Sequence, residues 1–370
     1  MQETEALAAA RWDMDICNAC RYCEGYCAVF PAMELRREFT NGDLSYLANL
    51  CHNCKDCYYA CQYSPPHEFG VNVPKAFAEL RSQSYAEYAW PRSLAVLFER
   101  NALAMSLVTA LFMAGVLIGA ALMRSPGVLF GRHLGPGSFY VIIPWNVMTG
   151  LAGLCFLFAV LCLTMGARAF WRDTGGHVAV KLDASALRNA ISDALSLRHL
   201  GGGGQGCNDT SEAFSQGRRL MHHALFYGFL LCFASTCVAT VYAHFLRLQA
   251  PYPVVSLPVV LGLVGGLGLM TGTIGLTYLK LISDPAPAAR NVLGADYALL
   301  VLLCLTAFTG LLLLTLRESA AMGALLAVHL GLVLAFFVLA PFSKFVHGIY
   351  RTLALIRYAG EKRSGAVTLG

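Results

Sequence analysis

Two matching cysteine runs near the N-terminus constrain this chain more than any other feature. CNACRYCEGYC and CHNCKDCYYAC share the spacing C-x2-C-x2-C-x3-C, with 23 residues between them. In iron–sulfur proteins that bind two [4Fe-4S] clusters with this spacing, the fourth cysteine of each run ligates the other cluster. The pattern predicts one cluster on Cys17, Cys20, Cys23 and Cys61, and a second on Cys51, Cys54, Cys57 and Cys27.

Zinc and disulfide bonds are the alternative uses of such cysteines. Structural zinc sites usually carry separated C-x2-C pairs, and disulfides between cysteines this close would be strained. The spacing therefore favours clusters. The proline that usually follows the fourth cysteine is absent, since Ala28 and Gln62 stand there. This departure bears on the exchange of the fourth ligand and not on the clusters themselves.

Composition places most of the chain in a membrane. Of its 370 residues 57% are hydrophobic and 13% charged, whereas soluble domains carry about 25% charged residues. The N-terminal stretch MQETEALAAARWDMD is acidic and lacks the continuous apolar core of a secretory signal. Cysteines arranged for iron imply a reducing compartment, so we expect a cytoplasmic head. No patch of basic and aromatic residues indicates a nucleic-acid partner.

The first 95 residues are polar and predicted to be mostly helical. Between the cysteine runs, AMELRREFTNGDLSYLANL predicts a helix, a turn at Asn41-Gly42-Asp43 and a second helix. After Cys61, Pro74 can open the helix KAFAELRSQ at its first turn. Two short helices between the runs and one after them favour an all-α ferredoxin-like domain over residues 1–95.

Six apolar segments follow, each long enough to cross a bilayer as a helix of about 20 residues. They cover residues 101–123, 139–166, 220–246, 255–282, 296–316 and 321–346. After the head, fourteen lysines and arginines lie on the side of the N-terminus and four on the opposite side, which predicts that both termini are cytoplasmic. After the head, the chain is expected to divide into residues 96–219, with two transmembrane helices and a cytoplasmic loop, and residues 220–370, with four transmembrane helices and a cytoplasmic tail.

Glycine-rich stretches occur in two places. In the long cytoplasmic loop, SALRNAISDALSLRHL has apolar residues at helical spacing and predicts a surface helix that ends in a flexible run at residues 201–204. No Gly-Lys-Ser/Thr follows, so this run is not a phosphate-binding loop. Gly265-Gly266-Leu267-Gly268 lies within an apolar segment with no strand before it, and predicts close helix packing. The chain carries no flavin or nicotinamide fingerprint.

Histidine is the main ionisable residue of the apolar segments, where such residues are usually functional. The third segment begins with His222 and His223 and ends with His244, and the sixth carries His329 and His347. Because the two segments run in opposite directions, His222 or His223 should be level with His347, and His244 with His329. At 100° per residue, the 18 positions from His329 to His347 return to about one face of a helix, and the offset of about 40° from His222 to His244 favours His222 over His223.

Imidazole is an axial ligand of haem iron, and helix bundles hold such cofactors in their cores. The pattern therefore predicts b-type haem between the third and sixth segments. One or two haems are compatible with it, since the two histidine levels lie roughly 27–33 Å apart by helix rise. A single haem would use His222 or His223 with His347. The alternative is that these histidines meet only water or headgroups. Lys344 and Arg351 are candidate partners of haem propionates or positive-inside anchors.

The residues that carry these patterns also resemble a known family. The head, from CNACRYC to VNVPKA, and the stretches LRHLGGGGQGC, RRLMHHALFYGF and PFSKFVHGIYR are similar to the tricarballylate or citrate utilisation protein B family over nearly the whole chain. The module also resembles the C-terminal half of a fused flavin, haem and iron–sulfur protein of cobalamin synthesis. Segments three to six resemble the four-helix cytochrome b (gamma) subunit of respiratory nitrate reductase. His329 and His347 fit its spacing, whereas His222 and His244 lie further apart than its pair.

The resemblance implies an electron-transfer protein of the bacterial inner membrane. It implies that the protein reoxidises the reduced flavin of a soluble FAD-dependent dehydrogenase and passes electrons through two clusters and haem b to a membrane quinone, with no catalytic residue of its own. A redox-regulated tricarboxylate transporter is the alternative, although the chain shows no internal repeat. In a redox sensor the membrane histidines would have no role. The expected docking face for the partner comprises Arg36, Arg37, Lys55 and the Pro65-Pro66-His67 turn.

Overall fold

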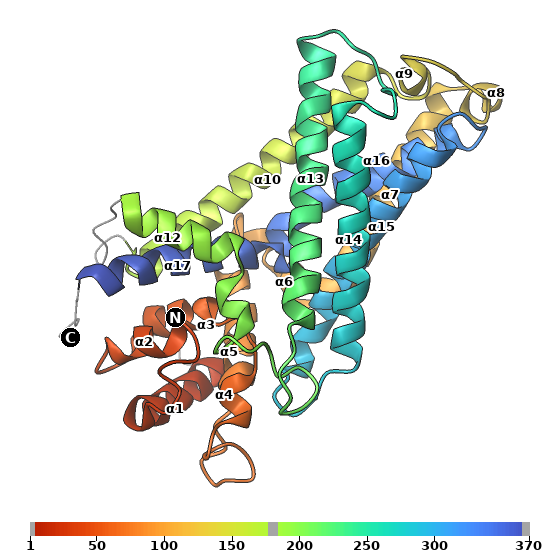
Figure 1. The fold of residues 1–370 in the computed structure, drawn as a ribbon. Coiled ribbons are helices and arrows are strands. Elements are labelled where there is room, and N and C mark those ends of the chain that lie inside the picture. The colour runs from red at the N-terminus through yellow and green to blue at the C-terminus, as the bar shows by residue number, and fades with distance from the viewer. Residues whose placement is uncertain (1–3, 177–183, 365–370) are drawn as a thin grey trace.

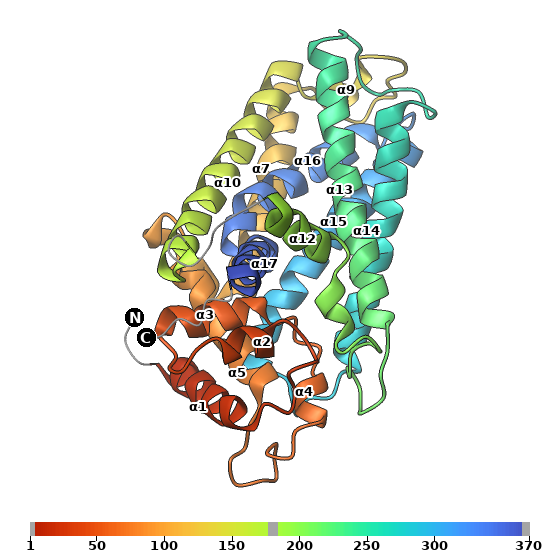
Figure 2. The same cartoon turned by 60° about the vertical axis from the view of Figure 1, so that its left-hand side comes forward.

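The computed structural model describes residues 4–176 and 184–364, and within those two ranges it contains helices and no β-strand (Figure 1). Helices α1 to α5 form an N-terminal head. Six long apolar helices stand beside one another, and the last helix, α17, lies between these helices and the head (Figure 2). The fold is therefore mainly α, as the sequence predicts.

The head begins with a helix that ends inside the first cysteine run. Helix α1 (Glu5–Cys20) starts where the Thr4 hydroxyl accepts a hydrogen bond from the amide of Leu7, and it ends at Arg21, whose φ of 56° is left-handed. Cys17 and Cys20 thus share one face of its last turn. The other head helices are α2 (Val29–Glu34), α3 (Asn41–Leu50), α4 (Asp56–Tyr59) and α5 (Val73–Glu87).

Helix ends in the head follow local capping rules. The turn predicted at residues 41–43 is wrong, because Thr40 and Asp43 form a capping box that makes these residues the first turn of α3. The opening of α5 agrees with the sequence. Pro74 occupies its first turn, and the side chain of Asn72 accepts a hydrogen bond from the amide of Lys75 at 3.2 Å.

Six helices are long and apolar enough to cross a membrane, which is compatible with a multi-pass membrane protein. They are α7 (Asn101–Met123), α10 (Trp145–Asp173), α13 (Gly217–His244), α14 (Leu257–Leu281), α15 (Leu293–Leu316) and α16 (Met322–Leu339). Short helices connect them: α6 (Val96–Glu99), α8 (Pro126–Leu129), α9 (Ser138–Ile142) and α12 (Ala184–Leu195). Helix α12 is the predicted surface helix, although it ends earlier than expected.

Glycines bring α13 and α14 into close contact. A Cβ at Gly228 would lie 2.4 Å from the amide nitrogen of Leu269, and a Cβ at Gly272 would lie 2.3 Å from that of Leu225. The sequence prediction that the glycine stretch at residues 265–268 serves helix packing is confirmed, since Gly265 faces the backbone of α13 in the same way. Helix α14 packs in turn on α15, and α16 packs on α15, α7 and α10.

The sixth apolar segment is not one helix. Helix α16 ends at Leu339, a 3-10 turn contains Pro341, Ser343 is extended with φ −130° and ψ 175°, and α17 begins at His347 and runs to Ser364. Proline lacks an amide hydrogen and its ring clashes with the preceding turn, which breaks the helix. The expectation that His329 and His347 share one face of a continuous helix is therefore wrong.

A buried ionic network joins α17 to the head. Glu361 accepts hydrogen bonds from Arg36 (2.5 Å), from Arg357 (2.7 Å) and from the Tyr46 hydroxyl (3.1 Å). Asp43 accepts from the same two arginines at 2.7 and 3.1 Å. Arg36 is only 4% exposed, so its assignment to an exposed docking face is wrong.

Candidate functional site

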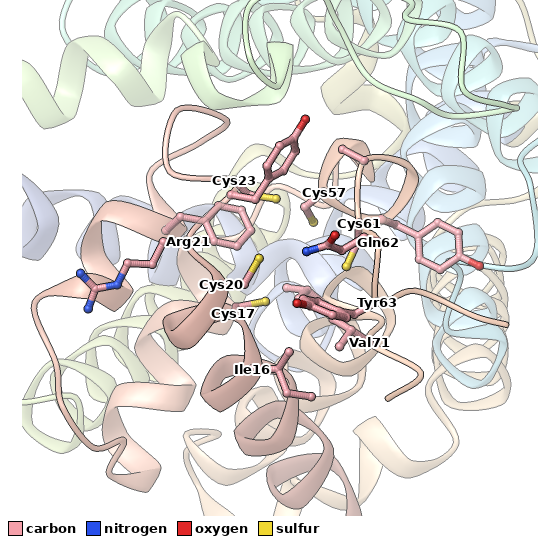
Figure 3. Close-up of a pocket in the computed structure, with 15 residues that line it drawn as sticks. Ile16, Cys17, Cys20, Arg21, Cys23, Cys57, Cys61, Gln62, Tyr63 and Val71 are labelled. Carbon is pink, nitrogen blue, oxygen red and sulfur yellow. The ribbon is translucent and has the colours of Figure 1, made fainter. Parts of the chain in front are cut away.

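The two cysteine runs meet around a cavity in the head (Figure 3). Its volume is about 250 Å³, and Cys17, Cys20, Cys23 and Cys61 line it together with Cys57. Ile16, Tyr63 and Val71 are among the apolar and aromatic side chains of its wall. Figure 3 shows sulfur atoms of both runs directed toward the space between them. We refer to the group Cys17, Cys20, Cys23 and Cys61 as the first cysteine site.

A second, smaller cavity of about 10 Å³ is lined by Cys27, Cys51, Cys54 and Cys57, which we call the second cysteine site. The grouping brings the fourth cysteine of each run to the other run, the arrangement typical of two [4Fe-4S] clusters. In the described parts of the chain, no three His, Cys, Asp or Glu side chains converge as a single metal ion would require. The thiols instead surround cavities, and each site offers the four sulfur ligands that a cluster needs.

Burial keeps at least one thiol in each site, Cys23 and Cys27, protonated unless a metal is bound. It raises the pKa of Cys23 in the first site to about 12, and that of Cys27 in the second site to about 12. Metal ligation requires the thiolate, so iron binding supplies the free energy that deprotonates these groups. In the second site the amide of Asn53 also donates to the sulfur of Cys51 at 3.3 Å.

Arginines from three helices hold the loop of the second cysteine site. The carbonyl oxygen of Cys51 accepts from Arg351 on α17 (2.7 Å) and from Arg81 on α5 (3.1 Å). Arg218 on α13 donates to the carbonyls of His52 (3.3 Å) and Asn53. The second site thus lies against the apolar helices.

Two histidines face each other one helical turn away from these arginines. His222 follows Arg218 by four residues on α13, and His347 precedes Arg351 by four on α17. Their ring centroids lie 6.2 Å apart. Two imidazoles on opposite sides of one iron, at metal–nitrogen distances of about 2 Å, would have centroids roughly 6 Å apart. This separation fits bis-histidine ligation.

The nitrogen atoms of the pair also suit a metal. Nδ1 of His347 lies 2.5 Å from the carbonyl oxygen of Lys344, a bond that leaves Nε2 available as a ligand. Burial lowers the pKa of His347 well below its usual value, which keeps the ring neutral. Nδ1 of His222 is buried and has no hydrogen-bond partner in the described part of the chain. The residues present therefore fit a haem held by His222 and His347.

The remaining candidate histidines have other neighbours. Nε2 of His223 lies 3.1 Å from the carbonyl of Ser196, away from His347. The ring of His244 packs on Trp145 at 4.9 Å, and Nδ1 of His329 lies 3.1 Å from the Thr309 hydroxyl.

The expected pairing of His244 with His329 is therefore wrong. Helix α13 packs mainly on α14, and α16 packs on α15, α7 and α10. The end of α13 that carries His244 and the part of α16 that carries His329 therefore pack on different helices.

Three predicted cationic partners are engaged elsewhere. Lys344 pairs with the buried Asp296, which also pairs with Lys280. The carboxylate that Lys344 contacts therefore belongs to the chain and not to a haem propionate. Arg351 donates to the carbonyls of the cysteine loop, as described above. Lys55 is only 4% exposed and donates to the Ser283 hydroxyl at 2.5 Å, so its place on a docking face is wrong.

The loop after α12 takes part in the second cysteine site, which the sequence did not predict. Gly202 has φ 54°, and a Cβ there would lie 1.6 Å from a carboxylate oxygen of Asp56; the amide of Gly203 donates to that oxygen at 3.2 Å. Within the run at residues 201–204, Gly202 and Gly203 are thus in contact with the head. The buried Cys207 packs beside Cys54.

Comparisons with known proteins identify the family of the chain. The profile of the family described as "Citrate utilization protein B" matches residues 94–368, and that of the "Citrate utilization protein B Fer4-like domain" matches residues 10–87. The chain is 45% identical over 363 residues to citrate utilization protein B of Escherichia coli, a match that covers 98% of this chain and 94% of the relative. No solved structure matches. The head with its two cysteine sites is thus the Fer4-like domain, and the chain belongs to the citrate utilization protein B family.

Proposed function

We propose that the protein carries electrons from the reduced flavin of a soluble dehydrogenase to a quinone in the membrane. Membership of the family, with its Fer4-like domain, suggests an iron–sulfur electron-transfer role in citrate utilisation. One observation supports the continuation into the membrane. Arg351, one turn from His347, binds the carbonyl of Cys51, so the cysteine and histidine sites are adjacent parts of one structure.

The cysteines and the histidines bind different cofactors in this proposal. The first and second cysteine sites would hold two [4Fe-4S] clusters, and His222 and His347 would hold one haem b. These groups transfer single electrons, which allows a two-electron flavin donor to be oxidised stepwise. The chain contributes ligands, spacing and electrostatic environment. It needs no acid, base or nucleophile.

The location of each site suggests the direction of transfer. The first cysteine site has the larger cavity, and Tyr22 in its wall is 67% exposed, so a soluble donor can approach there. The second site is enclosed by Arg81, Arg218 and Arg351 and lies toward the histidines. We propose a bacterial inner-membrane location with the head and both termini in the cytoplasm, because the loops beside the head carry most of the lysines and arginines.

The proposed identity of the donor rests on the family name and on the resemblance described above. The E. coli relative is named for citrate utilisation, so we propose that the partner is an FAD-dependent dehydrogenase acting on citrate, tricarballylate or a similar acid. The chain itself would not contact that acid, because it would receive only electrons from the partner.

The test is spectroscopic, on protein purified anaerobically in detergent. We expect broad iron–sulfur absorbance together with Soret and α bands that sharpen on reduction, and reoxidation of the reduced protein by a soluble quinone analogue. His347→Ala should abolish the haem bands and quinone reduction while retaining the cluster absorbance. The matched control is His223→Ala, which should retain both signals. A colourless protein, or full haem content in His347→Ala, would refute the proposal.

A further inference from the structure

The two cysteine sites have the same ligands but different electrostatic surroundings. Resting on the proposed function, we propose that Arg81, Arg218 and Arg351 give the cluster at the second cysteine site the higher reduction potential. It then accepts electrons from the cluster at the first cysteine site and is the donor to the haem. The arginines would thus set the direction of transfer within the head.

Fixed cations gather around the second cysteine site. Arg81 and Arg351 both donate to the carbonyl of Cys51, and Arg218 donates to that of His52. Arg81 is 6% exposed, so water screens its charge little. Reduction adds one negative charge to a cluster, and a nearby buried cation stabilises that added charge.

Carboxylates near the second cysteine site reduce this effect without cancelling it. Asp56 is buried beside Cys57, and Asp209 lies 3.4 Å from Arg218. The ammonium of Lys55, which donates to the carbonyl of Asp209 at 3.1 Å, adds a fourth cation. The carboxylate of Asp284 also lies near Lys55, so four cations against three carboxylates leave one positive charge.

The first cysteine site has weaker cationic surroundings in the described part of the chain. Arg21 lines its cavity, but this side chain is exposed and donates to the carbonyl of Asn18 at 2.9 Å. Asp13 is buried one helical turn before Cys17, and Glu24 follows Cys23 directly. Arg21 and Glu24 are both exposed, and burial raises the pKa of Asp13 to about 7, so its charge is only partial near neutral pH. These groups give the added electron less support than the buried arginines of the second site.

The second cysteine site also has more hydrogen bonds to its sulfur atoms than the first. In the second site, backbone amides of Asn53, Asp56, Val29 and Phe30 donate to the sulfurs of Cys51, Cys54 and Cys27. In the first site, the amides of Tyr63 and Ser64 donate to Cys61. Such bonds withdraw charge from the sulfurs and raise a cluster's potential.

Solvent access alone would give the cluster at the first cysteine site the higher reduction potential. Water near the first cysteine site stabilises a reduced cluster, whereas the enclosed second site excludes water. The enclosed site therefore depends on its fixed charges and amide bonds to hold the added electron. In its low-dielectric surroundings each of these acts more strongly than the exposed Arg21 does in water.

The experiment is a redox titration of the complete protein, followed by electron paramagnetic resonance of the reduced clusters. Two cluster signals of different potential are expected. Arg351→Gln and, independently, Arg81→Gln should lower the potential of the higher-potential cluster by about 59 mV or more, a tenfold change in its reduced-to-oxidised ratio. Arg351→Lys, which keeps the charge, should shift it less than Arg351→Gln. Arg21→Gln should leave it unchanged.

The outcomes separate this proposal from the proposed function. If clusters form and the arginine variants move the lower-potential signal, or neither signal, the order proposed here is overturned while the electron-transfer role stands. If iron analysis and spectra show no clusters in the wild-type protein, the proposed function itself fails. Arg81 lies on a different helix from Arg351, so a folding defect in one variant leaves the other to decide.

Discussion

Glu361→Ala should weaken the attachment of α17 to the head. The Glu361 carboxylate is 2% exposed and accepts hydrogen bonds from Arg36, Arg357 and Tyr46. The three distances are 2.5, 2.7 and 3.1 Å, and two of the three bonds join residues more than 300 positions apart. Removing the carboxylate leaves two buried guanidinium groups to share Asp43.

The magnitude follows from the burial of the network. Removing one partner of a buried ion pair costs about 3–5 kcal/mol, because it leaves an uncompensated charge in a low dielectric. Asp43 still accepts from both arginines, so we expect the lower end, about 3 kcal/mol. At 1.4 kcal/mol for each factor of ten, local opening of α17 becomes roughly 150 times more frequent.

Amide hydrogen exchange measures this opening directly, since it reports local free energies. Exchange of α17 amides should accelerate by about two powers of ten in Glu361→Ala, while α13 and α14 stay protected. Arg198→Ala is the matched control. Its side chain is 71% exposed and pairs with Asp193 at 3.4 Å, so its loss should cost at most about 1 kcal/mol. Acceleration below tenfold in Glu361→Ala, or equal to that of the control, would refute the reasoning.

Three further predictions concern other parts of the molecule. His222→Ala should remove the haem Soret band while His244→Ala retains it, because only His222 faces a second histidine; equal loss in both variants would contradict this. Gly272→Ala should lower the free energy of unfolding by about 1–3 kcal/mol, and with it the thermal midpoint in detergent, because the new Cβ would lie 2.3 Å from a backbone nitrogen. Gly115→Ala should leave the midpoint unchanged, because nothing lies within 4 Å of its new Cβ. Burial lowers the pKa of His199 below its usual 6.5, so the unfolded chain binds more protons and stability falls as the pH drops below 6.5. In denaturation at several pH values His199→Asn should show a smaller decline, and an unchanged slope would show that His199 does not contribute.

The predictions from local spacing agree well with the structure. Six apolar segments became six long helices, and the glycines of α14 pack against α13. The surface helix before residue 200 is present, and Pro74 opens α5. Each of these depends on residues within a few turns of one another, so propensity and periodicity are sufficient to predict them.

The predictions that failed required knowledge of distant parts of the chain. The helical phase from His329 to His347 failed because Pro341 ends α16, and yet His347 still meets His222 through the separate helix α17. Arg36 and Lys55 are charged and were expected at the surface. Both are buried, and they bond to Glu361 and Ser283, which are distant in the sequence.

Cysteine spacing and hydropathy act over short distances, so they were sufficient to predict the cysteine sites, the six apolar helices and the family. Helix packing, in contrast, places His222 and not His223 opposite His347, and it brings arginines from α5, α13 and α17 to the second cysteine site. Those contacts join residues up to 300 positions apart. They depend on how rigid helices pack, which no local pattern specifies.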